Sequence, residues 1–289
     1  MDTRNLKTET VIMTRSFPLL LLAIYTIALG AEQATRPPVD SGKVIVPVRN
    51  LPYNPAKVAL DIRNSYYHPD ELTGLDCTIS VDWPALFSAL KVNVPADRLK
   101  VLQGLKIQSR AVRAKIPEFT FDWTSGPFDN SEQFVSGFKQ MASGFYQIYW
   151  PMIASAPIKD AADITKVEPQ QDGSAKVYSS GPNIGVVMTI DEKSIPTHYT
   201  VESPVMNGTI DPHYIASPKP VSGDLRRISS VDVTEQVGTS TMNVKLNLDY
   251  QEVNGFYVPK HVSFDLVGAY SLSLDFSACS ASKDAALSK

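Results

Sequence analysis

The sequence predicts an α+β protein in which a twisted antiparallel sheet is covered by one long helix. From residue 163 onward, short segments of alternating apolar and polar residues are separated by Gly, Pro, Asn or Asp, as in a strand meander. Ahead of them, residues 131–153 carry one wide apolar stripe at helical spacing. Strands with such short connections favour antiparallel pairing over βαβ units.

Composition is that of an ordinary globular protein, with 289 residues, of which 43% are hydrophobic and 20% are charged. This length allows one large domain or two small ones. The formal net charge of -3 gives no signal for binding a polyanion, so we expect no nucleic-acid partner.

The N-terminus indicates export. Residues 17–30 are uncharged, follow Arg15 and end in small residues. This run is shorter than the roughly 20 residues that a membrane-spanning helix needs. We therefore predict that residues 1–30 are a signal peptide cleaved near Gly30, with Met13 as an alternative start and a periplasmic or extracellular mature protein. An uncleaved anchor is the alternative interpretation.

Domain boundaries follow from composition. Residues 31–55 are rich in Pro and polar residues, which indicates a flexible lead-in. We expect a single β-rich domain over residues 56–280 and a disordered tail over 281–289. A short helix is expected over 55–65, with Asn54 as its cap and a proline in its first turn.

The first half of the domain mixes strands with short helices. Residues 74–83, "GLDCTISVDW", alternate cleanly and predict a half-buried strand. Short helices are expected over 84–90 and 97–102. Further strands are expected over 105–116 and 118–123.

The strongest helix signal covers residues 131–153. Its apolar residues recur at spacings of three and four, and they are Phe134, Val135, Phe138, Met141, Ala142, Phe145, Ile148, Tyr149 and Met152. Asn130 and Gln133 form a capping pair in sequence. Pro151 is expected to kink or end the helix. The stripe can be a lid over an apolar pocket, or the face of a core helix packed on a sheet.

The second half of the domain is a series of strands. Asn254-Gly255 predicts a tight turn, because both residues tolerate positive φ. Pro259, inside a strand pattern, predicts an edge or a bulge. The alternation gives the sheet one apolar face, which must be covered by a helix or a ligand. The expected strands cover 174–180, 184–191, 197–203, 207–214, 225–236, 240–250, 255–266 and 269–279.

Catalytic motifs are missing from the sequence, which contains no G-x-S-x-G, H-E-x-x-H, Walker or G-x-G-x-x-G pattern. We therefore predict no enzymatic activity, no catalytic residue, no metal and no cofactor. His68, Asp70 and Glu71 lie close together in sequence, as in a metal or acid-base site. A polar turn built around Pro69 explains them more simply.

Cys77 and Cys279 are the two cysteines, and in an oxidising compartment they are predicted to form a disulfide that joins the first and last strands. Cys77 shares the apolar phase of its strand, whereas Cys279 falls in the polar phase. Residues on opposite faces cannot bridge unless the last strand twists or bulges near its end. Two free thiols are the alternative.

A family resemblance is carried by residues 248–266, "LDYQEVNGFYVPKHVSFDL". The spacing of Tyr250, Asn254-Gly255, Phe256 and Pro259 resembles the LolA-like group of periplasmic lipoprotein carriers and related lipid-binding proteins. The resemblance implies a strongly curved, unclosed β half-barrel whose concave face is covered by a long amphipathic helix and short helices. It also implies binding of an apolar ligand.

The function expected from these observations is an exported binding protein for a lipid or acyl chain, in transient contact with a membrane surface or an envelope protein. The alternative is a non-catalytic structural or interaction module of the cell envelope with a filled core. Oligomeric state is not predicted. The expected ligand-binding residues are Phe134, Phe138, Met141, Phe145, Tyr149, Leu246, Leu248 and Phe264.

Overall fold

A computed structural model describes residues 54–283, except 114, 159, 182–183, 204–206, 217–225, 238–239 and 269. The predicted signal peptide, almost all of the predicted lead-in and residues 284–289 lie outside the described residues. Within the described ranges, no helix is long and apolar enough to cross a membrane.

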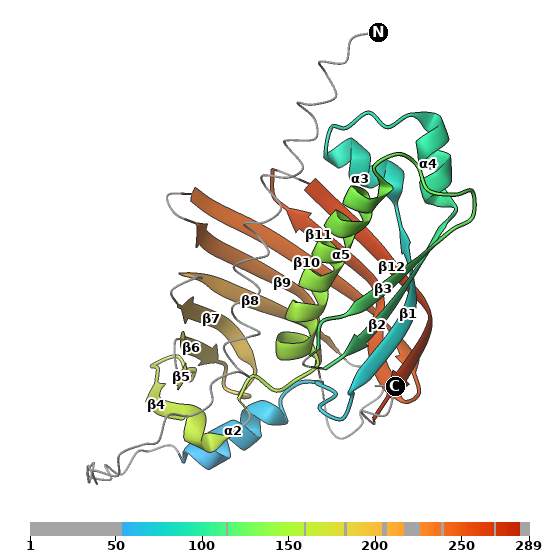
Figure 1. Cartoon of the computed structure of the whole chain (residues 1–289). Coiled ribbons are helices and arrows are strands. Elements are labelled where there is room, and N and C mark those ends of the chain that lie inside the picture. Colours follow the sequence, from blue (N-terminus) through green and yellow to red (C-terminus); the bar gives the residue numbers. More distant parts are fainter. Residues whose placement is uncertain are drawn as a thin grey trace, which may run out of the picture.

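Twelve described strands form a single antiparallel sheet in the order β3-β2-β1-β12-β11-β10-β9-β8-β7-β6-β5-β4. The sheet curves strongly and its edge strands, β3 and β4, do not pair, so it is unclosed (Figure 1). The predicted α+β class with an unclosed, curved antiparallel sheet is confirmed. The strands are β1 (Gly74–Val81), β2 (Leu105–Val112), β3 (Glu118–Trp123), β4 (Ile164–Pro169), β5 (Ala175–Gly181), β6 (Ile184–Ile190), β7 (Pro196–Glu202), β8 (Asn207–Ala216), β9 (Arg226–Val237), β10 (Ser240–Val253), β11 (Phe256–Leu266) and β12 (Tyr270–Ser282).

Strands β4 to β12 follow one another as a meander, and β12 then pairs with β1 from the start of the domain. The β1–β12 ladder runs from Gly74 opposite Ser282 to Val81 opposite Leu274. Since β12 continues to Ser282, the disordered tail predicted from residue 281 is wrong for its first two residues. Ala281 is buried.

Short helices flank the sheet. They are α2 (Pro55–Arg63), α3 (Trp83–Ala89), α4 (Ala96–Gln103) and the 3-10 turn η2 (Ala161–Asp163). The predicted cap of α2 is confirmed, because Asn54 Oδ1 accepts a hydrogen bond from the backbone N–H of Ala56 at 2.9 Å. Asp82 caps α3 in the same way through Ala85.

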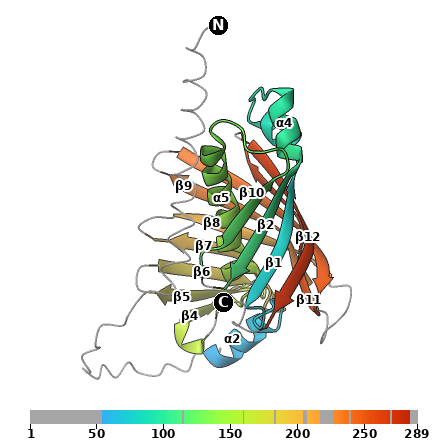
Figure 2. The same cartoon turned by 45° about the vertical axis from the view of Figure 1, so that its right-hand side comes forward.

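The longest helix, α5 (Ser131–Ile148), is followed by a π-helical turn, η1 (Tyr149–Ile153). The α-helix therefore ends three residues before Pro151, which lies in the π-helical turn. The predicted capping pair is wrong, because Asn130 adopts a left-handed φ of 65° and its side chain makes no cap hydrogen bond. Figures 1 and 2 show α5 lying inside the curve of the sheet.

The β10–β11 hairpin turns at Asn254 and Gly255, whose φ angles are 51° and 82°, as the sequence predicts. The pairing then slips, with Asp249 opposite His261 and Tyr250 opposite Pro259. One residue of β11 is therefore extra, and the bulge predicted near Pro259 is confirmed. β11 is an interior strand between β10 and β12, so the edge alternative is wrong.

Candidate functional site

The eight predicted ligand-binding residues belong to one apolar core. On α5 and η1, Phe138, Phe145 and Tyr149 are buried, whereas Phe134 and Met141 are half-buried. In the sheet, Leu246 and Leu248 are buried and Phe264 is half-buried. Leu246 pairs directly with Phe264, and both pack in the same core as the helix aromatics.

The C-terminal end of α5 is packed with rings. The ring centroid of Phe145 lies 5.2 Å from that of Tyr146, 5.7 Å from that of Tyr149 and 5.5 Å from that of Phe276 on β12. Tyr149 in turn contacts Trp150 at 5.1 Å. Such offset and edge contacts stabilise a core beyond the burial of their area. This end of α5 is therefore fixed to the sheet.

The N-terminal end of α5 differs, because its aromatic neighbours are only half-buried. We call Phe121, Trp123, Phe128, Phe134 and Met141 the aromatic rim. Phe128 lies 5.5 Å from Trp123 and 5.8 Å from Phe134, between ring centroids. The rim continues inward to buried Trp83, 5.3 Å from Phe134, so it connects the surface to the core.

Two cations border the aromatic rim. The guanidinium carbon of Arg98 lies 5.8 Å from the ring centroid of Phe128. The ammonium of Lys139 lies 5.6 Å from the ring centroid of Phe121. Cations at this distance are attracted to the negative face of an aromatic ring.

A second cluster, which the sequence did not indicate, surrounds Arg227 at the start of β9. Arg227 is only 8% exposed. Its guanidinium carbon lies 5.0 Å from the ring centroid of Tyr250 and 4.5 Å from that of Tyr257. The ring of Tyr67 meets that of Tyr257 edge to face at 5.5 Å. We call Tyr67, Tyr250, Tyr257 and Arg227 the arginine cage.

Several buried polar atoms without a hydrogen-bond partner lie near the C-terminal end of α5 and the start of β9. Within the described part of the chain they include Tyr66 Oη, Tyr149 Oη, Trp150 Nε1 and Arg227 Nε. Burial raises the pKa of the Tyr66 and Tyr149 hydroxyls, so both stay protonated at neutral pH. Nothing in an alternating strand pattern distinguishes buried Arg227 from its exposed neighbour Arg226.

His68 and Asp70 come together, but in a structural junction. Burial opposes ionisation of Asp70, yet nearby His68 and hydrogen bonds from Arg63 and the Ala156 N–H lower its pKa. Arg113 donates to the carbonyl of Asp70 at 2.7 Å. Glu71 points elsewhere and pairs with a lysine of the C-terminal segment. Among the described residues, no group of three His, Cys, Asp or Glu is arranged to hold a metal.

The predicted disulfide is present, joining Cys77 on β1 to Cys279 on β12 with 4.2 Å between their Cα atoms. Two residues of β12, Ala278 and Cys279, lie opposite Cys77, and Ala278 has a φ of 47°. This bulge shifts the phase of β12 and brings Cys279 to the side of Cys77. The condition stated for the pairing, a bulge near the strand's end, is therefore met.

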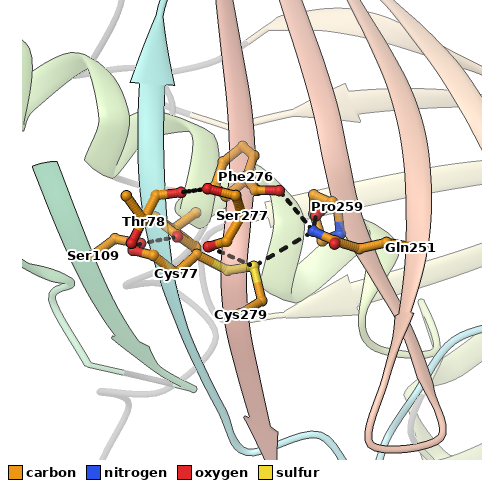
Figure 3. Close-up of a disulfide and its surroundings, with 9 residues drawn as sticks. Cys77, Thr78, Ser109, Gln251, Pro259, Phe276, Ser277 and Cys279 are labelled. Carbon is orange, nitrogen blue, oxygen red and sulfur yellow. Dashed lines mark hydrogen bonds between the residues drawn. A yellow bond between two sulfur atoms is a disulfide. The ribbon is translucent and has the colours of Figure 1, made fainter. Parts of the chain in front are cut away.

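The side chain of Gln251 lies beside the disulfide (Figure 3). Its Nε2 donates to the carbonyls of Pro259 at 3.0 Å and Phe276 at 2.8 Å, next to the bulges of β11 and β12. On the other side, Ser109 Oγ donates to the carbonyl of Cys77 at 3.3 Å and lies 2.7 Å from Tyr146 Oη. The disulfide is thus linked to α5 by hydrogen bonds.

Glu235, on β9, is a buried carboxyl that is only 3% exposed. Its Oε1 has no partner in the described structure, and burial raises its pKa to about 7. It lies opposite Gly208, where an added Cβ would come within 2.3 Å of the Thr234 carbonyl oxygen. A side chain at position 208 is therefore excluded beside this carboxyl.

Comparison with protein-family models, curated proteins and solved structures finds no match to this chain. The LolA-like resemblance and the ligand role of the eight residues therefore stay predictions.

Proposed function

We propose that the protein is an exported binding protein that holds the apolar part of a ligand, such as an acyl chain of a lipid, between α5 and the curved sheet. The observation that carries this proposal is the aromatic rim. The core normally takes up large rings fully, whereas here Trp123, Phe128 and Phe134 are only half-buried and contact one another in a row that leads to buried Trp83.

The character of α5 supports an apolar guest. Its outer side carries exposed Glu132, Lys139 and Gln140, and its inner side carries Phe138 and Phe145. We infer that this amphipathic helix covers the concave face of a half-barrel, as the sequence resemblance implies. A ligand would enter along the half-buried N-terminal side of the helix, since the C-terminal side is held by rings and by the bond from Tyr146 to Ser109.

The rim also suits transient contact with a lipid surface. Aromatic rings that are partly accessible to solvent favour the interface between water and hydrocarbon, and nearby cations favour anionic head groups. Arg98 and Lys139 supply such cations beside Phe128 and Phe121. The bound ligand would then be a lipid taken from, or delivered to, that surface.

The alternative of a non-catalytic envelope module with a filled core is favoured by one observation. Phe138, Phe145, Tyr149, Leu246 and Leu248 are already buried against protein atoms. In that case the rim would be a docking surface for another envelope protein, and the interior would take up no ligand.

Lipid extraction and native mass spectrometry of the exported protein separate these two functions, followed by titration with a fluorescent fatty acid. Carrier function predicts copurifying lipid and saturable binding. Phe134→Asp should weaken binding at least tenfold, because it puts a charge in the rim. Leu60→Asp is the matched control, since Leu60 is 56% exposed on α2. A lipid-free mass with no saturable binding supports the filled module.

The predicted export is tested on the same sample. N-terminal sequencing of the exported protein should begin near Ala31. A mature form that retains residues 17–30 contradicts the cleaved signal peptide.

A further inference from the structure

Arg227 is a buried cation, and one of its hydrogen-bond donors has no acceptor among the described residues. A guanidinium has five N–H donors in one plane and stays charged at any physiological pH. In the described structure, the Nε donor of Arg227 has no hydrogen-bond partner. Its Nε is fully shielded from solvent. Burying a charge without a counter-charge is unfavourable, so such a group calls for an anion.

The arginine cage places two tyrosine rings against the guanidinium. The rings of Tyr250 and Tyr257 take up cation–π contacts at 5.0 and 4.5 Å. The cage hydroxyls are engaged with the backbone, because Tyr250 Oη donates to the Ile228 carbonyl at 2.6 Å and Tyr67 Oη accepts from the Tyr257 N–H at 2.9 Å. The rings are therefore held in place without using the N–H groups of Arg227.

The cage provides no negative charge of its own. Burial raises the pKa of both Tyr250 and Tyr67, so these hydroxyls are neutral at pH 7. Glu252 acts electrostatically on Tyr67, and its side chain is exposed. The hydroxyls of Tyr67 and Tyr250 therefore supply no counter-charge to Arg227.

We propose that Arg227 binds an oxyanion, a carboxylate or a phosphate, through the N–H groups along its edge. A guanidinium edge matches both groups in a two-point contact, and its hydrogen bonds to a charged acceptor are short and strong. The oxyanion belongs to the head group of the ligand or to a free small anion. The inference for a head group rests on the proposed function; the inference for the oxyanion itself does not.

The position of the cage fits a head group at one end of the apolar interior. Tyr250 follows Leu248 and Leu246 on the same face of β10, since strand residues two apart point the same way. Tyr149, at the end of α5, is close enough to Tyr250 for the two to interact electrostatically. An oxyanion at Arg227 would therefore lie beyond Leu246 and Leu248 along β10, next to the end of α5.

The experiment compares ligands that share a tail and differ in head group. Palmitate, hexadecyl phosphate and methyl palmitate are titrated by calorimetry into the exported protein. We expect the two anions to bind at least tenfold tighter than the ester. Arg227→Gln should remove this preference and leave ester binding unchanged. Arg226→Gln is the matched control, because it removes the same charge from an exposed neighbour and should change nothing.

Each other outcome is decisive. If the ester binds as tightly as the anions to the unmodified protein, the oxyanion inference is overturned while acyl-chain binding stands. If no lipid binds, the proposed function fails, and inorganic phosphate then tests the inference alone. Phosphate that raises the melting temperature of the unmodified protein, but not that of Arg227→Gln, identifies a free small anion; no such rise overturns the inference.

A folding control is needed for the Arg227 variants. If Arg227→Gln does not give the circular dichroism spectrum of the unmodified protein, Arg227→Lys replaces it. Lysine keeps the charge but loses the two-point contact, so we expect the preference for hexadecyl phosphate over the ester to fall several-fold. An unchanged preference in Arg227→Lys contradicts recognition through the guanidinium edge.

Discussion

Replacing Phe145 with Ala tests whether the C-terminal half of α5 is permanently packed on the sheet. Phe145 is 4% exposed and contacts the rings of Tyr146, Tyr149 and Phe276. The truncation removes a buried ring that contacts Phe276 on β12.

The expected loss is large. A buried Phe→Ala change lowers the free energy of unfolding by about 3–5 kcal/mol. We expect a loss of about 4–5 kcal/mol for Phe145→Ala, in the upper part of this range. Its three ring contacts stabilise the fold beyond the contribution of the buried apolar area. For a domain of this size, a loss of about 1 kcal/mol lowers the melting temperature by roughly 2–4 °C, so the shift should be roughly 8–20 °C.

Urea unfolding followed by tryptophan fluorescence measures this loss. The urea midpoint should fall without a change in slope, since the surface exposed on unfolding stays the same. Phe134→Ala is the control, because Phe134 is half-buried in the rim and should lose about 1–2 kcal/mol. A loss below about 1.5 kcal/mol for Phe145→Ala, equal to that of Phe134→Ala, would refute permanent packing of α5.

Three more predictions concern the sheet. A thiol count on denatured, non-reduced protein should find no reactive thiol, and two free thiols would contradict the disulfide. Reduction should lower the free energy of unfolding by about 2–5 kcal/mol, because the disulfide joins Cys77 and Cys279, which are 202 residues apart. The folded pKa of Glu235, about 7, lies above its unfolded value of 4.5. The stability that the protonated carboxyl supports is therefore complete below pH 4.5 and is lost as pH rises through about 7. Between these pH values, the free energy of unfolding of the unmodified protein should fall by up to about 3 kcal/mol more than that of Glu235→Gln. Parallel plots of the free energy of unfolding against pH for the two proteins would contradict this. Ala278→Gly should raise the free energy of unfolding by about 1 kcal/mol, because glycine tolerates the left-handed φ of the bulge; a loss on thermal melting would contradict this.

Most strands of the sheet could be predicted, because apolar and polar residues alternate along a strand when one face of the sheet is buried. The turn at Asn254-Gly255 and the bulge near Pro259 follow from the backbone preferences of those residues. Strand β4 was not among the expected strands, since in Ile164–Pro169 only Ile164 and Val167 are buried and no clean alternation results. The phase conflict of Cys279 was visible in the sequence, but the residue that resolves it, Ala278, is one that rarely adopts positive φ.

The arginine cage was not predictable in the same way. Its members come from the segment before β1 and from β9, β10 and β11, so only the folded chain brings them together. The pairing of β8 with β9 slips between His213 and Tyr214, next to Ile228, which disturbs the alternation around Arg227. The spacing of the α5 stripe predicts buried Phe138, Ala142 and Phe145, but it omits Tyr146, which is also buried.

The pairing of β1 with β12 sets an order of events during synthesis. Among the described strands, β1, β2 and β3 are made first, yet they join the rest of the sheet through β12, which is made last. Until β12 emerges, Phe145 and Tyr146 lack their contacts with Phe276, and rings that will be buried stay accessible. Contacts between residues this far apart form slowly and leave unfinished chains prone to aggregation. A chain truncated before β12 should therefore need a holding chaperone, even though most of its strands are already made.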